Sequence, residues 1–190
     1  MLLLVGLGNP GSNYTNTRHN IGFKIIDAIN AHFKLSKQKP KFKGLLTTGS
    51  IDEKKIYAIK PLTFMNNSGT AIKELIDYFK IDAKDVFVFH DDMDIDFGKI
   101  KAKFGGSSAG HNGIESIDKF IGKDYSRVRI GIGHPKQKKK VNNHVLEDFK
   151  EDEEEKINEI TENIVKQLPT LIEKKIDLFS SKVNQDLNGI

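Results

Sequence analysis

The chain has 190 residues, 37% of them hydrophobic and 29% charged, with a net charge of +4 and no cysteine. These values are typical of one folded soluble domain that covers residues 1–190. The lack of cysteine excludes disulfides, thiolate zinc sites and a cysteine nucleophile. The N-terminal apolar run is too short for a signal peptide, and the sequence has no apolar segment long enough to span a bilayer. We therefore expect a cytoplasmic protein with no membrane partner.

The first predicted strand, residues 2–7, leads into Gly6-Leu7-Gly8-Asn9-Pro10-Gly11. These six residues match the G-x-G-x-x-G template of dinucleotide-binding proteins, in which a helix follows the strand at once and binds the pyrophosphate. Here turn residues follow instead, and apolar residues at helical spacing begin only near Ile21. The sequence also lacks a second strand ending in a ribose-binding acid. The match is therefore weak evidence for a dinucleotide.

The rest of the chain alternates between strand and helix patterns. Further strands are expected over residues 45–50, 55–60, 86–89, 98–104 and 127–132. Helices are expected over residues 21–33, after Ser68 as far as Phe79, in a short segment through Phe120, and from Glu151 onward with a kink at Pro169. Ser68 is expected to cap its helix, and the polar residues 34–43 to form a loop. This order predicts an α/β fold: a single domain with a twisted mixed β-sheet and helices packed on both faces.

Several polar residues lie where the predicted strands meet loops, at the sheet edge where ligands bind in open α/β folds. They are Asn9, His19, Asn66, Asp91 and Asn112. Each alone is explained by a turn or a helix cap. Together, one histidine, one carboxylate and three carboxamides suit hydrolysis by an activated water. The carboxylate would orient the imidazole, and a carboxamide N–H would stabilise a developing oxyanion.

The acidic stretch His90-Asp91-Asp92-Met93-Asp94 raises the alternative of a divalent metal site. Consecutive Asp91 and Asp92 should leave a strand in opposite directions, and no paired histidines complete a ligand set. We therefore expect no metal. A second charged segment places four lysines within residues 136–140, which suits either a solvated loop or contact with a polyanion.

Six motifs, in order along the chain, together resemble the bacterial-type peptidyl-tRNA hydrolases over roughly residues 1–150. They are Gly6-Leu7-Gly8-Asn9-Pro10-Gly11, Tyr14 through Thr17-Arg18-His19-Asn20, Thr63-Phe64-Met65-Asn66-Asn67-Ser68-Gly69, His90-Asp91-Asp92-Met93-Asp94, Gly110-His111-Asn112-Gly113, and residues 127–135. The sequence departs from the family pattern at Ala109, where glycine is frequent, and at residues 142–144. The dinucleotide match is then a coincidence.

The resemblance implies an esterase that cleaves the bond between a peptide, or an N-acyl amino acid, and the 3′ ribose of tRNA. It implies a monomer that needs no metal or organic cofactor. His19 is implied as the general base that activates water, with Asp91 hydrogen-bonded to it. The residues implied to contact the peptide end of the substrate are Asn9, Tyr14, Phe64, Met65, Asn66, His111 and Asn112. Those implied to contact tRNA phosphates are Lys101, Lys103, Arg129, Lys138 and Lys140.

Three other functions stay open on the sequence alone. A non-catalytic nucleic-acid-binding module would use the lysines and leave His19 and Asp91 without a role. A dinucleotide-dependent oxidoreductase would depend on the first glycine motif alone. A metal-assisted phosphatase would use Asp91, Asp92 and Asp94 and would lose activity on chelation.

Overall fold

The structure is a computed structural model that describes the backbone of residues 1–135 and 141–188. Seven strands form one sheet in the order β2-β3-β4-β1-β5-β7-β6. Their bounds are Leu2–Gly6 (β1), Lys39–Lys41 (β2), Gly44–Ile51 (β3), Lys54–Pro61 (β4), Val86–Asp92 (β5), Ile100–Phe104 (β6) and Ser126–Gly131 (β7). β1, β4, β5 and β7 run parallel to their neighbours in this central group, whereas β2, β3 and β6 join antiparallel. The mixed sheet predicted from the sequence is confirmed.

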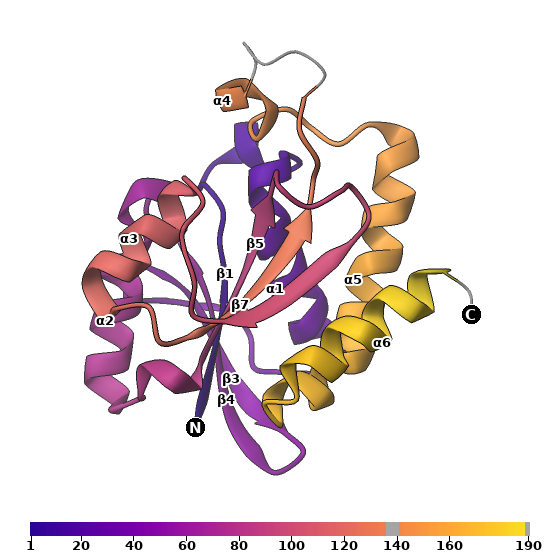
Figure 1. Ribbon diagram of the computed structural model, residues 1–190. Helices are drawn as coiled ribbons and strands as arrows, with labels where there is room; N and C mark the ends of the chain where they lie inside the picture. The colour runs from indigo at the N-terminus through magenta and orange to yellow at the C-terminus, as the bar shows by residue number, and fades with distance from the viewer. Residues whose placement is uncertain (136–140, 189–190) are drawn as a thin grey trace.

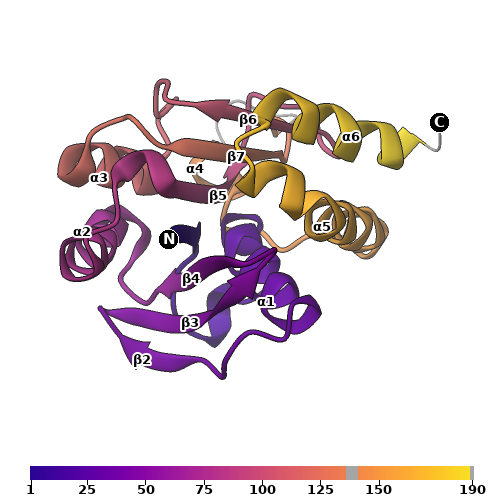
Figure 2. The same ribbon diagram turned by 90° about the horizontal axis from the view of Figure 1, so that it is seen from below.

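Helices cover both faces of this sheet (Figure 1). Their bounds are Ile21–His32 (α1), Ser68–Phe79 (α2), Asn112–Ile121 (α3), Val141–His144 (α4), Glu151–Ile172 (α5) and Ile176–Asn188 (α6). Seen from below in Figure 2, α2 and α3 lie on one side of the strands, and α1, α5 and α6 lie on the other. Among the described helices, none has the length and apolar character needed to cross a bilayer.

The central strands are apolar because both of their faces are buried. Side chains alternate along a strand, so β5 sends Phe87 and Phe89 into the core under α1 and α5, and Val86 and Val88 into the core under α2 and α3. The same alternation continues to the end of β5. It therefore decides on which side of the sheet each polar residue after Phe89 lies.

The structure extends β5 three residues beyond the predicted strand. Register pairing with β7 continues through Asp92, which lies opposite Gly131, so His90, Asp91 and Asp92 belong to the strand itself. A hydrophobicity pattern does not reveal these last three residues of β5, because the end of a strand can be polar where it reaches a pocket.

Three further elements, β2, α4 and α6, were not predicted. The segment expected to be a loop, residues 34–43, contains the short edge strand β2, whose Lys-Pro-Lys sequence is exposed and carries no hydrophobic alternation. The predicted C-terminal helix is α5, which continues past Pro169 and ends at Ile172. A separate helix, α6, follows it, after Lys174 adopts a left-handed φ of 64°. On α6, Ser180 and Asn184 accept hydrogen bonds from the edge strand β6, at the N–H groups of Ala102 and Ile100 respectively.

The expected capping role of Ser68 is wrong. Ser68 is the first residue of α2 rather than the residue before it, and its buried hydroxyl donates to the carbonyl of Met65 at 2.8 Å. The bond ties the helix to the short 3₁₀ turn Met65–Asn67, which carries two of the predicted site residues.

Candidate active site

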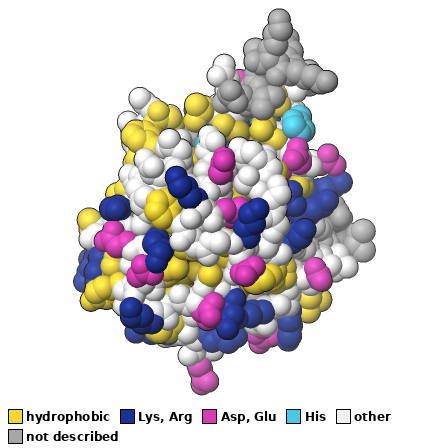
Figure 3. Space-filling view, turned by 60° about the vertical axis from the view of Figure 1, so that its left-hand side comes forward, with side chains coloured by type: hydrophobic (Ala, Val, Ile, Leu, Met, Phe, Trp, Pro, Cys, Tyr) yellow, Lys and Arg dark blue, Asp and Glu magenta, His cyan; other side chains and the backbone are white. Residues whose placement is uncertain are grey.

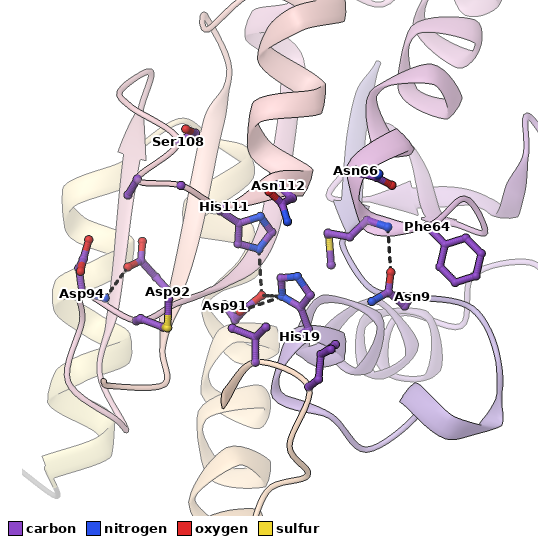
Figure 4. Close-up of a pocket in the computed structure, with 16 residues that line it drawn as sticks. Asn9, His19, Phe64, Asn66, Asp91, Asp92, Asp94, Ser108, His111 and Asn112 are labelled. Carbon is purple, nitrogen blue, oxygen red and sulfur yellow. Dashed lines mark hydrogen bonds and ion pairs between the residues drawn. The ribbon is translucent and has the colours of Figure 1, made fainter. Parts of the chain in front are cut away.

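A pocket of about 330 Å³ lies at the carboxyl ends of β1 and β5, as expected for an α/β sheet. Figure 4 shows side chains from both halves of the chain converging on it. The predicted residues in its wall are Asn9, His19, Phe64, Met65, Asn66, Asp91, His111 and Asn112. Tyr14 is not part of the wall: its ring packs edge-on against Phe64 at a centroid distance of 6.5 Å. Phe64 is 58% exposed and forms the rim.

A histidine–carboxylate pair lies at the buried side of the pocket. Nδ1 of His19 is 2.8 Å from Oδ1 of Asp91 and 3.0 Å from Oδ2. Asp91 shares its face of β5 with Phe87 and Phe89, which is the face covered by α1, and His19 lies in the 3₁₀ turn Arg18–Asn20 just before α1. The pleat of β5 and the start of α1 therefore bring together two residues 72 positions apart.

The charge state of this pair follows from its surroundings. Burial raises the pKa of Asp91, but the charges of His19 and His111 and their hydrogen bonds outweigh it and hold that pKa far below its usual value. Burial lowers the pKa of His19, and the charge and hydrogen bond of Asp91 reverse this to a net rise. Because an ionised carboxylate only accepts hydrogen bonds, Nδ1 of neutral His19 carries the proton and Nε2 holds the lone pair.

His111 reaches the same carboxylate from the other side of the sheet. Its Nε2 lies 2.9 Å from Oδ1 of Asp91, and its Nδ1 accepts hydrogen bonds from the N–H groups of Gly113 and Ile114 at the start of α3. The ring of His90 packs edge-on against His111 at 4.8 Å. Burial and the neighbouring His111 hold the pKa of His90 well below its usual value.

Asn9 is held rigidly in the first glycine motif. Its backbone N–H donates to Oδ1 of Asn20 at 2.8 Å, and its carbonyl accepts from Nδ2 of Asn20 at 2.9 Å. Its own Oδ1 accepts from the N–H of Met65 at 2.8 Å. The carboxamide orientation is therefore fixed, with its Nδ2 donor left for a ligand in the pocket.

The glycines of that motif serve helix packing. A Cβ on Gly6 would collide with the carbonyl of Gly22, and a Cβ on Gly8 would lie 2.8 Å from the ring of Phe23, so both glycines allow α1 to approach β1. Gly11, with φ 107°, makes the turn. Ala109 on the opposite wall has φ 48°, which explains why glycine suits this position, where the sequence departs from the family pattern.

The predicted tRNA-contacting residues lie beside the pocket on β6 and β7. Lys101 pairs in register with Arg129, which places them on one face of the sheet, and Lys103 follows two residues later. Both lysines are exposed, whereas Arg129 donates from Nε to Oδ2 of Asp92 at 2.8 Å. Lys138 and Lys140 lie outside the described residues. On the side of the molecule that carries α2 and α3, Figure 3 shows lysine and arginine side chains intermixed with acidic ones.

The three aspartates of the metal alternative have different partners. Asp91 binds the two histidines, Asp92 binds Arg129, and Oδ1 of Asp94 lies 2.8 Å from Nε2 of the exposed His134. The opposite directions expected for Asp91 and Asp92 are confirmed. His19, Asp91 and His111 do have ligand atoms within 4.8 Å of one another. Their nitrogens facing the carboxylate are occupied by hydrogen bonds to it.

Arg18 was not predicted as a site residue, and it is almost completely buried. Its guanidinium donates to the carbonyls of Glu147 and Asp148, pairs with Glu153 at 2.6 Å and lies over the ring of Phe149. The N–H of His19 donates to the carbonyl of Val145 at 2.8 Å. Arg18 thus ties the His19 turn to a distant segment that closes the pocket, an interaction for which the local sequence gives no signal.

Known proteins of similar sequence and structure belong to one family. The model of the family described as peptidyl-tRNA hydrolase matches residues 3–189. A peptidyl-tRNA hydrolase of Pelagibacter ubique (strain HTCC1062) is 72% identical over 184 residues, which cover 97% of this chain and 99% of the relative. That of Ehrlichia ruminantium (strain Welgevonden) is 47% identical over 181 residues, covering 95% and 93%. The crystal structure of peptidyl-tRNA hydrolase from Acinetobacter baumannii matches with a TM-score of 0.90 at 33% identity, covering 97% and 94%. The chain belongs to the peptidyl-tRNA hydrolase family.

Proposed function

We propose that this peptidyl-tRNA hydrolase cleaves the ester between the peptide and the 3′ ribose of tRNA with a water activated by His19. The observation that carries the mechanism is the buried His19–Asp91 pair in the pocket wall. Asp91 fixes the proton on Nδ1, so Nε2 accepts the proton of the attacking water. Asp91 then stabilises the imidazolium that forms. Transfer of that proton to the ribose oxygen releases free tRNA and the peptide carboxylate.

The carboxamides in the wall supply the remaining groups. Attack of water on the ester carbonyl makes an oxyanion, and the N–H groups of Asn66 or Asn112 are the donors proposed to stabilise it. Asn66 lies in the Met65–Asn67 turn, next to the residue whose N–H is bonded to Asn9, and Asn112 is the first residue of α3. Figure 4 shows all three carboxamides at the pocket. Phe64 and Met65 offer apolar contact to the peptide side chain.

Asn9 is proposed to select N-acylated substrates. Its oxygen is occupied by the N–H of Met65, so only Nδ2–H is free, and that donor requires a carbonyl. A peptidyl or N-acyl amino acid has an acyl carbonyl on its nitrogen, whereas a free aminoacyl group presents a charged amine. An unpaired buried polar group costs about 1–3 kcal/mol, which corresponds to roughly 5- to 150-fold discrimination.

The basic residues are proposed to bind tRNA through its phosphates. Exposed Lys101 and Lys103 lie on β6 on the same sheet face as Arg129, and phosphate contacts of this kind do not read the base sequence. Such binding suits an enzyme that accepts many tRNAs. We also propose Lys138 and Lys140 as phosphate contacts, a monomeric state, a single domain over residues 1–190, no organic or metal cofactor, and a cytoplasmic location.

The test compares N-acetyl-aminoacyl-tRNA with free aminoacyl-tRNA, in EDTA, for the wild type, His19→Ala and the exposed control His32→Ala. The expected result is fast release from the acylated substrate only, unchanged by His32→Ala. His19→Ala should be slower by roughly 10²–10⁴ as a general base is removed. Equal rates for wild type and His19→Ala would reject the proposed base. Tight, salt-sensitive tRNA binding without turnover would instead favour a non-catalytic RNA-binding module.

A further inference from the structure

His111 does not fit the simple role of a substrate contact, because both of its ring nitrogens are already bonded within the protein. Nδ1 lies 3.1 Å from the N–H of Gly113 and 3.3 Å from that of Ile114. Both partners are donors, so Nδ1 must present its lone pair and the ring proton must lie on Nε2. That proton points to Oδ1 of Asp91, 2.9 Å away.

The start of α3 therefore fixes the tautomer of His111. His111 is the N-cap residue of this helix, and the first N–H groups of a helix lack partners within it. An imidazole that satisfies them can only donate from Nε2. The fold thus places a fixed hydrogen-bond donor against Asp91, on the side opposite His19 (Figure 4).

Both histidines bond the same carboxylate oxygen. Oδ1 of Asp91 is 2.8 Å from Nδ1 of His19 and 2.9 Å from Nε2 of His111. Asp91 is 1% exposed, so little water competes for its charge. A hydrogen bond from one donor reduces the negative charge that the carboxylate offers to the other.

We propose that His111 is a positioning residue, which holds Asp91 in place and limits the negative charge that Asp91 offers to His19. The inference depends on the proposed role of His19 as the base. If Asp91 acted on His19 without this restraint, His19 would hold its proton to higher pH and would be less available as a base. His111 thus keeps the base in its active form at lower pH.

Other charged groups near His19 are paired with partners of their own. Asp92 is bonded to Arg129, Asp94 to His134, and Arg18 to Glu153. His144 lies 3.8 Å from Glu147 in the segment that packs on the His19 turn. His90 donates from Nδ1 to the carbonyl of Asp91 at 2.8 Å and, being buried, is uncharged. Each of these groups has another partner, whereas His111 is bonded to the Asp91 carboxylate itself.

The variant that isolates this bond is His111→Asn. Asparagine is a good N-cap residue, so it can still accept from the first N–H groups of α3. Its side chain ends where Nδ1 of the imidazole lies, which leaves Asp91 without its second donor. His111→Ala removes both the bond to Asp91 and the helix cap. The fall in its melting temperature relative to His111→Asn measures what the cap contributes to stability. His32→Asn is the matched control, because His32 is an exposed histidine at the end of α1.

Two readouts test the proposal on the full chain. The first is the titration of His19 by ¹H–¹⁵N NMR without substrate, and the second is the pH profile of kcat/KM with N-acetyl-aminoacyl-tRNA. In His111→Asn we expect both midpoints to rise by on the order of half a pH unit, which lowers kcat/KM below the midpoint about threefold. The melting temperature and KM should stay close to those of the wild type and of His32→Asn.

A His19 midpoint in His111→Asn that matches the wild type, or falls below it, would overturn the proposal. A changed KM with an unchanged midpoint would assign His111 to the substrate instead. Because the NMR titration needs no turnover, it also separates this inference from the proposed function. An inactive wild type would reject the function and leave the His19 titration still measurable.

Discussion

Asp91 and Asp92 are consecutive, both are buried, and both lie at the end of β5, yet they have different partners. Asp91 faces α1 and is bonded to His19 and His111. Asp92 faces the opposite side, where its Oδ2 accepts from Nε of Arg129 and its Oδ1 from the N–H of Asp94. The pleat of one strand thus gives two neighbouring carboxylates separate environments.

The difference lies in the partners more than in burial, because Asp91 is 1% exposed and Asp92 7%. Histidine changes its charge near neutral pH, whereas arginine stays charged throughout. The Asp91 cluster can therefore gain and lose a proton during a reaction. The Asp92 carboxylate instead orients Arg129 and fixes the turn to Asp94.

The largest effect should come from Asp91→Asn. The new carboxamide can donate to Nδ1 of His19, which would move the ring proton to Nε2 and remove the base. We expect kcat to fall by about 10²–10³ with a KM close to that of the wild type. Single-turnover release from N-acetyl-aminoacyl-tRNA measures this. If Asp91→Asn lowered kcat less than Asp92→Asn does, the proposed difference in role between the two carboxylates would be wrong.

A smaller effect is expected from Asp92→Asn. This change leaves His19 and its tautomer intact but weakens the hydrogen bond that orients Arg129. We expect kcat/KM to fall by less than about tenfold, mainly through KM, since a broken buried pair affects binding geometry rather than proton transfer. Steady-state kinetics with Arg129→Gln as a parallel variant checks this. Equal reductions in kcat for Asp91→Asn and Asp92→Asn would contradict it.

The smallest effects should follow from Lys101→Ala and Lys103→Ala. Both side chains are exposed on β6 and outside the pocket wall, so only tRNA binding should weaken, by a few-fold each. The slope of log K against log salt should become shallower by about one for each lysine that no longer neutralises a phosphate. Fluorescence titrations of tRNA over a salt series measure the slope, with the exposed Lys37→Ala as control. An unchanged slope would remove these lysines from the interface.

The sheet was largely predictable because its central strands are apolar on both faces and its helices are amphipathic. β2 was not, since Lys39-Pro40-Lys41 is an exposed edge without hydrophobic alternation. α6 was missed because a short charged segment around Lys174 separates it from α5. β2 has no hydrophobic pattern of its own. α6 has one, since Phe179, Val183 and Leu187 are buried at helical spacing, but the sequence does not mark where α5 ends and α6 begins.

The site was predictable in its members but less so in its hydrogen bonds. The strand ends located Asn9, His19, Asp91 and Asn112, and the pleat rule separated Asp91 from Asp92. The family resemblance added Phe64, Met65 and His111, which also line the pocket. The bond from His111 to Asp91 depends on how α3 begins, and the hydrogen bonds of Arg18 join residues about 130 positions apart. Long-range interactions of this kind leave no periodic signal in the sequence.

The most direct test of the catalytic pair is the titration of His19 by NMR in the wild type, Asp91→Asn and Asp92→Asn. The ionised Asp91 raises the pKa of His19, so the wild-type midpoint should lie above the ordinary value of 6.5, and the base form should be lost as pH falls through it. Asp91→Asn should lower the midpoint clearly, and Asp92→Asn should shift it less. A midpoint in Asp91→Asn equal to that of the wild type would contradict the proposal that Asp91 controls the base.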